Sequence, residues 1–271
     1  SAAVQAVSGF TVTKKIKPMR SHQYALGGYY TGINGWEFSV EGYYKDMRNV
    51  LEYKDGVSFF GSSSGWENKV EMGKGRSAGI EFMAQKTAGK TTGWLSYTLS
   101  KSDRKFTKGG INNGEWFPYK YDRRHSINLT INHKFSDRID IGASWVFYTG
   151  GTSTIPEEKT TVIRPHNGAN NGFLWYGTYD NTNSSPTIGD VSYIEHRNNF
   201  RLPASHRLNL GVNFNKKTKH GMRTWNISLY NAYNAMNPAW VYRGHNKQGL
   251  SVIKKYTLLP LIPSFTYTYK F

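Results

Sequence analysis

Apolar and polar residues alternate with a period of two along most of this chain. Over residues 127–135 the odd positions are Ile, Leu, Ile, His and Phe, and the even positions are Asn, Thr, Asn and Lys. This period predicts β-strands with one apolar and one polar face. Residues 139–148 repeat the pattern after only residues 136–138, so the two runs are predicted to form a hairpin with a tight turn.

The connections between the predicted strands alternate strictly in length, and about nine strands follow from the pattern. The short connections lie at residues 34–35, 88–90, 136–138 and 217–220, and the long ones at roughly 48–75, 103–121, 150–203 and 232–255. Outer-membrane β-barrels have short periplasmic turns and long extracellular loops. The spacing therefore predicts an all-β fold, an antiparallel transmembrane β-barrel.

The composition favours the same fold. Aromatic residues make up 15% of the chain and hydrophobic residues only 38%, so the aliphatic content is low for a soluble β-sandwich or lectin, which is the alternative. No stretch reaches the 18 or so apolar residues of a membrane-spanning helix, whereas a spanning strand needs only about ten residues, apolar at alternate positions. The apolar face is expected to meet lipid and the polar face a lumen.

Charge and cysteine content narrow the classes of function. The formal net charge is +17, which favours an anionic partner such as lipopolysaccharide, while the dispersed basic residues and the lack of a binding motif argue against nucleic acid. The absence of cysteine excludes disulfides and thiol nucleophiles. The histidines have no metal-ligand spacing, so no metal and no cofactor are expected.

Four segments resemble TonB-dependent outer-membrane receptors, particularly those of Bacteroidota. They are residues 16–24, 121–129, 201–210 and the end of the chain, 258–271. The resemblance implies a barrel of about 22 strands filled by an amino-terminal plug. This sequence has about nine strands and an odd count, so residues 1–271 are expected to be the carboxy-terminal portion of a larger barrel.

The resemblance implies a part in active, TonB-driven uptake of a scarce nutrient (an iron chelate, vitamin, glycan or peptide) across the outer membrane of a Gram-negative bacterium, with the carboxy terminus periplasmic. The implied partners are the rest of the barrel, the plug, the TonB complex, the barrel-assembly machinery, outer-membrane lipid and lipopolysaccharide, and a surface lipoprotein. One alternative is a complete small barrel acting as a passive pore or adhesin. Another is an outer-membrane enzyme, but Ser205 and His206 are neighbours on a predicted strand and should point to opposite faces.

Candidate site residues fall into three groups. Aromatic and basic residues of the long loops are candidates for ligand contact, or else pack the loops together: Trp116, Tyr119, Trp175, Tyr176, Trp240, Tyr242 and Arg243. Basic residues at the outer ends of strands are candidates for lipopolysaccharide phosphates or for a plug carboxylate: Arg123, Arg124 and Arg207. The resemblance implies an assembly signal in the last strand: Phe265, Tyr267, Tyr269 and Phe271.

Overall fold

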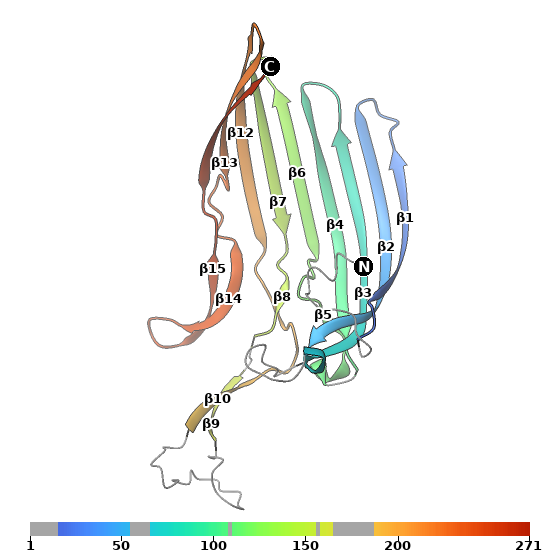
Figure 1. The fold of residues 1–271 in the computed structure, drawn as a ribbon, viewed down its shortest axis with the longest axis vertical. Coiled ribbons are helices and arrows are strands. Elements are labelled where there is room, and N and C mark those ends of the chain that lie inside the picture. Colours follow the sequence, from blue (N-terminus) through green and yellow to red (C-terminus); the bar gives the residue numbers. More distant parts are fainter. Residues whose placement is uncertain (1–15, 55–65, 108–109, 156–157, 165–186) are drawn as a thin grey trace, which may run out of the picture.

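The main element of the computed structural model is one curved antiparallel sheet (Figure 1). The structure describes residues 16–54, 66–107, 110–155, 158–164 and 187–271. Along the sheet, each strand pairs with the next in this order: β1 (Arg20–Tyr30), β2 (Trp36–Tyr53), β3 (Val70–Lys86), β4 (Thr91–Lys105), β6 (His125–Lys134), β7 (Ile139–Tyr148), β12 (Ser205–Thr218), β13 (Gly221–Tyr230) and β16 (Ile262–Lys270). The short strand β5 (Phe117–Pro118) pairs with the end of β4. The nine predicted strands and their antiparallel order are confirmed.

The tight turns all lie at one end of the sheet and the long connections at the other (Figure 1). The long connections hold further short elements: η1 (Trp66–Lys69), η2 (Ile111–Gly114), β8 (Thr152–Ser153) paired with β11 (Phe200–Arg201), β9 (Glu158–Arg164) paired with β10 (Thr187–Tyr193), and β14 (Pro238–His245) paired with β15 (Ser251–Thr257). The predicted alternation of connection lengths is thus confirmed, although two of the predicted loops, 150–203 and 232–255, contain strand pairs.

Strands β2, β3 and β4 run further toward the long loops than the sequence pattern predicted. β2 continues to Tyr53 and β3 begins at Val70, so both ends of the loop expected over residues 48–75 are sheet. The apolar alternation fades beyond Tyr44, which is why the extension was missed. A bulge between Arg48 and Val50, with Asn49 at a φ of 59°, interrupts the pairing without ending it.

Local chemistry sets the tight turns. Gly35 has a φ of 73°, and a Cβ there would lie 2.9 Å from that of Ala88, so glycine serves both the turn and the packing of adjacent hairpins. In the turn after β6, Lys134 forms an ion pair with Asp137 at 3.0 Å. The hydrogen bond that the Lys134 ammonium donates to the Asp137 carboxylate holds the pKa of this exposed carboxyl below its ordinary value.

The register gives the sheet one apolar face and one polar face. Val40 lies opposite Phe82, and Phe82 lies opposite Tyr97. One position along, Ser39 and Ser96 flank Met83 on the other side of the sheet. Large side chains of the apolar face are uncovered within the described chain: Leu26 is 85%, Phe265 65% and Ile227 49% exposed.

The buried apolar cluster lies at the loop end of the sheet, away from the apolar face. It comprises Val50, Phe106, Ile111 and Phe117, with Met47 packed against it. A soluble sandwich would cover its apolar face with a second sheet, whereas this chain leaves that face open. Lipid is the environment in which such a face is stable, and the sheet must then close with other strands. No helix in the described portion is long and apolar enough to cross a membrane.

Candidate functional site at the base of the long loops

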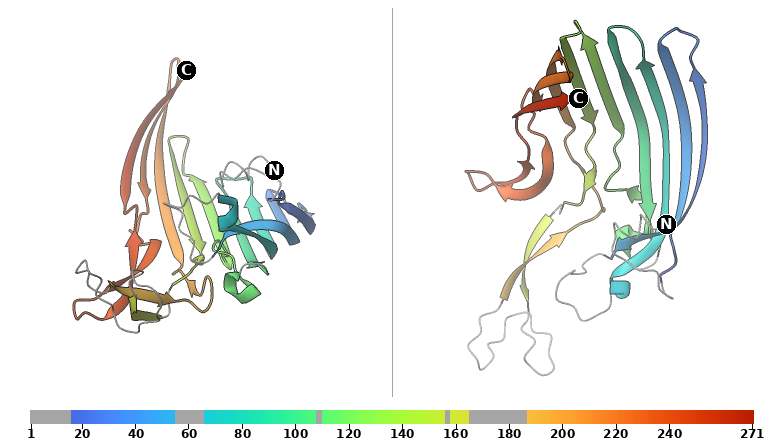
Figure 2. Two further views of the ribbon diagram at one scale, coloured as in Figure 1. Left: turned by 60° about the horizontal axis from the view of Figure 1, so that its bottom comes forward. Right: turned by 45° about the horizontal axis from the view of Figure 1, so that its top comes forward.

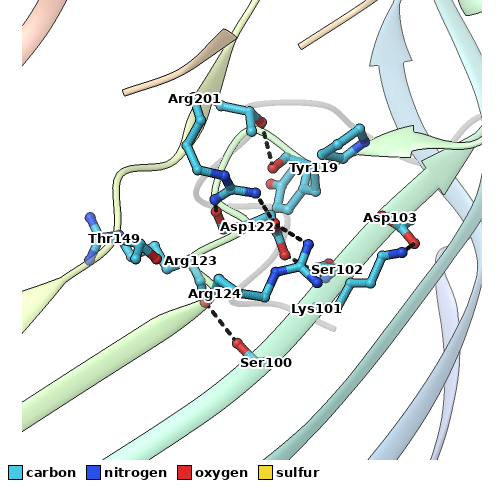
Figure 3. A network of polar contacts seen from close by, with 12 residues as sticks. Ser100, Lys101, Ser102, Asp103, Tyr119, Asp122, Arg123, Arg124, Thr149 and Arg201 are labelled. Carbon is cyan, nitrogen blue, oxygen red and sulfur yellow. Dashed lines mark hydrogen bonds and ion pairs between the residues drawn. The ribbon is translucent and has the colours of Figure 1, made fainter. Parts of the chain in front are cut away.

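Asp122 is the centre of a network that joins two long connections, the one between β4 and β6 and the one between β7 and β12, to strand β4 (Figure 3). It lies before β6 and is only 1% exposed. One carboxylate oxygen accepts a hydrogen bond from the backbone N–H of Ser102 on β4 at 2.7 Å. The other accepts from the guanidinium of Arg201 at 2.6 Å and from that of Arg124 at 3.3 Å. A buried carboxylate with three donors is held in a single position.

Arg201, on the short strand β11, extends this network to the segment after β7. Its second guanidinium nitrogen donates to the backbone carbonyls of Asp122 at 2.7 Å and of Gly150 at 2.9 Å. Three segments far apart in sequence therefore share one guanidinium. The planar fork of arginine suits this role, because its several donors have fixed directions.

A second network ties the segment before β11 to the end of β2. The backbone N–H of Arg197 donates to the side-chain oxygen of Asn112 at 2.7 Å. Its guanidinium donates to the carbonyl of Tyr53 at 2.8 Å and lies 3.4 Å from the carboxylate of Glu52. Both side chains of this ion pair are less than one fifth exposed, so solvent screens the pair weakly.

Trp116 and Tyr119, predicted as ligand contacts, pack against arginines on opposite faces of the sheet. The ring of Trp116 lies 4.3 Å from the guanidinium carbon of Arg76, which is on the apolar face. The ring of Tyr119 lies 3.7 Å from the guanidinium carbon of Arg104, which is on the polar face. The Arg104 guanidinium also donates a hydrogen bond to the backbone carbonyl of Leu51. These two aromatics therefore do not form a single platform.

The hairpin β14–β15 carries the third predicted cluster. Trp240 stacks on Tyr256 with ring centroids 4.3 Å apart and is 50% exposed. Tyr242 is 47% exposed, and Arg243 is opposite Ile253 in the register. The aromatic rings of the hairpin are about half exposed, so both ligand contact and loop packing stay open as roles. Trp175 and Tyr176 lie outside the described residues.

The three predicted basic residues lie on the polar side of the sheet. Arg123 lies 4.0 Å from the ring of Tyr148, a polar-face residue of β7. Arg207 lies over the ring of Tyr230 and donates to its hydroxyl. Arg124 pairs with Asp122. These arginines were predicted to meet either lipopolysaccharide phosphates or a plug carboxylate. Arg124 instead meets a carboxylate of this chain, that of Asp122.

The aromatic residues of the last strand share the apolar face, as alternation requires. Phe265 lies opposite Ile227 and Tyr267 opposite Trp225. The Trp225 ring packs 5.1 Å from Phe265 and 4.4 Å from Tyr267, and the series continues through Tyr269 to Phe271. The intervening residues of β16 lie opposite polar-face positions of β13.

The described residues form no arrangement suited to catalysis by Ser205 and His206. Ser205 lies opposite Tyr148 on the polar face and is 4% exposed, while His206 lies opposite Phe147 and shares a hydrogen bond with the Tyr233 hydroxyl at 2.9 Å. The two side chains point to opposite faces, as predicted. Within the described residues no group of His, Cys, Asp or Glu could hold a metal ion.

Sequence reasoning assigned no role to Asp122, Arg197 or Arg201, which carry the two networks. Asp122 and Arg201 lie within the segments 121–129 and 201–210 that carry the family resemblance. That resemblance was the one feature of the sequence that could have pointed to them. No curated protein matches this chain.

Three solved structures with a similar fold, all distant in sequence, are an import receptor, a transporter and a receptor for ferric compounds. The ferric-catecholate import receptor Fiu from K12 E. coli is 14% identical, with a TM-score of 0.54 over 94% of this chain and 28% of its own. The unliganded ferric citrate transporter FecA is 12% identical, with a TM-score of 0.51 over 91% of this chain and 30% of its own. The ferripyoverdine receptor of the outer membrane of Pseudomonas aeruginosa is 11% identical, with a TM-score of 0.51 over 93% of this chain and 27% of its own. The chain thus spans less than a third of each of these structures. The family model for the TonB dependent receptor-like β-barrel matches residues 3–240, and the chain belongs to that family.

Proposed function

We propose that this chain is the carboxy-terminal portion of the barrel of a TonB-dependent transporter that takes up a scarce nutrient across the outer membrane. The observation that carries the proposal is the open two-faced sheet. Within the described residues, β1 pairs only with β2 and β16 only with β13, on opposite sides of the sheet (Figure 2). In lipid, unpaired edge groups cost several kcal/mol each, so further strands of the same barrel are needed to pair with both edges.

The long loops face the cell exterior in this proposal, and the tight turns and carboxy terminus face the periplasm. The asymmetry of connection lengths supports this orientation. The networks of Asp122 and Arg197 fix the bases of the long loops, so that a rigid wall carries the loops that meet the nutrient.

A plug in the lumen is supported by the chemistry of the polar face. Asp140 and Arg207 each have a buried side-chain atom without a hydrogen-bond partner among the described residues. Buried polar atoms are normally paired, so a polar partner from outside this chain would satisfy them. Arg207 is therefore our candidate for contact with a plug carboxylate, and TonB would act through the plug.

The nutrient is proposed as an iron chelate, with vitamins, glycans and peptides as the other classes to test. The iron-chelate receptors among the similar structures support this order of testing. Trp240, Tyr242 and Arg243 on the β14–β15 hairpin are the described candidates for contact with it. Phe265, Tyr267, Tyr269 and Phe271 are proposed as the signal read by the barrel-assembly machinery, and a surface lipoprotein as a further partner of the loops.

Uptake in the source bacterium tests this function. A strain lacking the gene should lose uptake of a labelled ferric chelate or another member of the nutrient classes, and the intact gene should restore it only where TonB is functional. Restoration without TonB would favour a passive pore. A mass near 30.8 kDa for the polypeptide purified from outer membranes would contradict the larger barrel.

A further inference from the structure

Four cations lie directly opposite one another in a row across β1–β4. The register places Arg20 opposite Arg48, Arg48 opposite Lys74, and Lys74 opposite Lys105. Arg20, Arg48 and Lys74 are exposed and Lys105 is half-buried. Like charges directly opposite each other in a sheet are destabilising, so a bound anion would stabilise this arrangement. We call these four residues the cation row.

The cation row lies on the apolar face, beyond the apolar band. Moving two residues at a time from the loops toward the turns, the same face carries a mixed-charge row, a tyrosine-containing row and an apolar row. These rows are His22, Asp46, Arg76 and Asp103; then Tyr24, Tyr44, Ala78 and Lys101; then Leu26, Gly42, Ile80 and Leu99. This succession is typical of a barrel exterior that passes from acyl chains through an aromatic girdle into the headgroup region.

The depth of the cation row fits lipid headgroups. It lies four residues beyond the row of Tyr24 and Tyr44, which is about 13 Å along a strand. With a strand tilt of about 40°, this is about 10 Å along the membrane normal. The row thus lies outside the acyl chains, on the headgroup side of the aromatic girdle, whereas a nutrient in the lumen would be on the other side of the wall.

The carboxylates on this face pair with only one member of the row, Arg48. Asp46 pairs with Arg48 at 3.4 Å, and Asp103 pairs with Arg76 at 3.1 Å and with Lys101 at 3.5 Å. No carboxylate in the described part of the chain lies within ion-pair distance of Arg20, Lys74 or Lys105. The cation row, the mixed-charge row and the tyrosine-containing row together hold six Lys and Arg side chains, including Arg76 and Lys101, against two carboxylates, both already paired.

An aromatic surface adjoins these charges. The Trp116 ring lies against Arg76 and is 37% exposed. Arg76 is in turn fixed by Asp103, which is only 4% exposed. A cluster of cations beside an accessible indole presents both charge for phosphate and a flat apolar surface for a sugar ring.

We propose that the cation row, together with Arg76 and Trp116, binds the phosphate groups of a phosphorylated glycolipid in the outer leaflet, the chemistry of lipopolysaccharide. The assignment rests on the proposed orientation of the long loops. It is separate from the contacts considered for Arg123, Arg124 and Arg207, which lie on the polar side of the wall.

The test compares two double variants of the full-length receptor purified from outer membranes. Arg48→Gln with Lys74→Gln removes an opposed Arg–Lys pair from the cation row. The matched control, Lys216→Gln with Arg223→Gln, removes an opposed Lys–Arg pair from the turn end of the same face. Binding of lipopolysaccharide to the delipidated receptor is measured for each, alongside dephosphorylated lipopolysaccharide and inorganic phosphate.

The first variant should bind lipopolysaccharide about three- to thirty-fold more weakly than the wild type, as expected for two partly screened charge contacts, and the control should bind normally. Equal binding by both variants, or equal binding of the dephosphorylated lipid, would overturn the inference. Complete displacement by inorganic phosphate at concentrations equal to the lipid's would show a free-phosphate site instead. Loss in the control alone would overturn both this inference and the proposed orientation.

A transport measurement separates this inference from the proposed function. The Arg48→Gln, Lys74→Gln variant should take up the nutrient at the wild-type rate per folded receptor, because its changes lie outside the lumen. Absence of nutrient uptake by the wild type, with lipid binding lost only in this variant, would refute the transporter and retain the glycolipid site.

Discussion

Replacing Ile227 by arginine tests which face of the sheet meets lipid. Ile227 lies on β13 between Val212 and Phe265 of the neighbouring strands, with 49% of its side chain exposed. It is four residues from Arg223 near the turn, about 13 Å along the strand and about 10 Å along the membrane normal at a tilt of about 40°. Since the apolar band of such barrels is about 25 Å tall, Ile227 is near its middle.

The expected cost follows from this depth. An arginine near the bilayer mid-plane of a barrel destabilises it by about 2–4 kcal/mol, which is about a 30- to 700-fold change in the folding equilibrium. The matched control is Ser228→Arg. Ser228 lies opposite Gly211 and Ser264 on the polar face, where there is water or polar protein to solvate a guanidinium. We expect a cost below about 1 kcal/mol there.

Heat-modifiable gel mobility of outer-membrane fractions measures the folded fraction of each variant, and urea titration in lipid vesicles gives the difference in unfolding free energy. Ile227→Gln should fall between the wild type and Ile227→Arg, because it introduces polarity without charge. Equal folding of Ile227→Arg and Ser228→Arg, or poorer folding of the latter, would refute the assignment of faces and favour a soluble sheet.

Three further changes test the rest of the structure. Deleting Phe271 should reduce the amount of folded barrel in the outer membrane before it alters uptake per folded molecule, and an unchanged folded amount would argue against its role in assembly. An epitope tag at Gln248 should be labelled on intact cells and one at Asp137 should not; the reverse would invert the topology. Arg201→Gln should leave the buried Asp122 carboxylate with fewer donors, destabilising the loop bases by about 1–3 kcal/mol, seen as faster hydrogen exchange there, whereas Arg138→Gln in a tight turn should not change exchange at the loop bases.

The strands and tight turns were predictable because their signals are local. Alternation over eight to ten residues fixes which face of a strand is apolar, and it gave the right faces for β6, β7, β12, β13 and β16. The Asn34–Gly35 pair similarly marks its turn, since Gly35 takes a positive φ.

Beyond the apolar band, the sequence signal disappears while the hydrogen-bonded ladder continues. Residues of β2 from Lys45 onward alternate between charged and mixed side chains, so their period of two has no hydrophobic contrast. The β14–β15 hairpin was missed for the same reason, because aromatic and basic residues occur on both sides of it. Strand length in this region depends on pairing with neighbours that a single segment does not reveal.

The polar networks could not be predicted because their members are remote in sequence. Asp122 and Arg201 are 79 residues apart, and Arg197 and Tyr53 are 144 apart. Trp116 and Tyr119 illustrate the opposite case, since they are close in sequence but lie over arginines on opposite faces. Composition identified these loops as rich in aromatics and cations; only the register decides which cation each ring meets.

The extension of β2, β3 and β4 past the apolar band links the two surfaces that carry function in our proposals. Alternate residues of the extended segments point to opposite sides, so Lys105 belongs to the outward cation row while Arg104, its neighbour, stacks under Tyr119 at the loop base. A shorter strand would place neither residue at the required height, because both sit beyond Leu99 of the apolar band. One stretch of ladder thus holds the loops on its inner side and presents charge to lipid headgroups on its outer side. Substitutions at the odd positions of residues 101–105 should therefore alter lipid binding, and substitutions at the even positions should alter the stability of the loop bases, because alternate residues of a strand point to opposite faces.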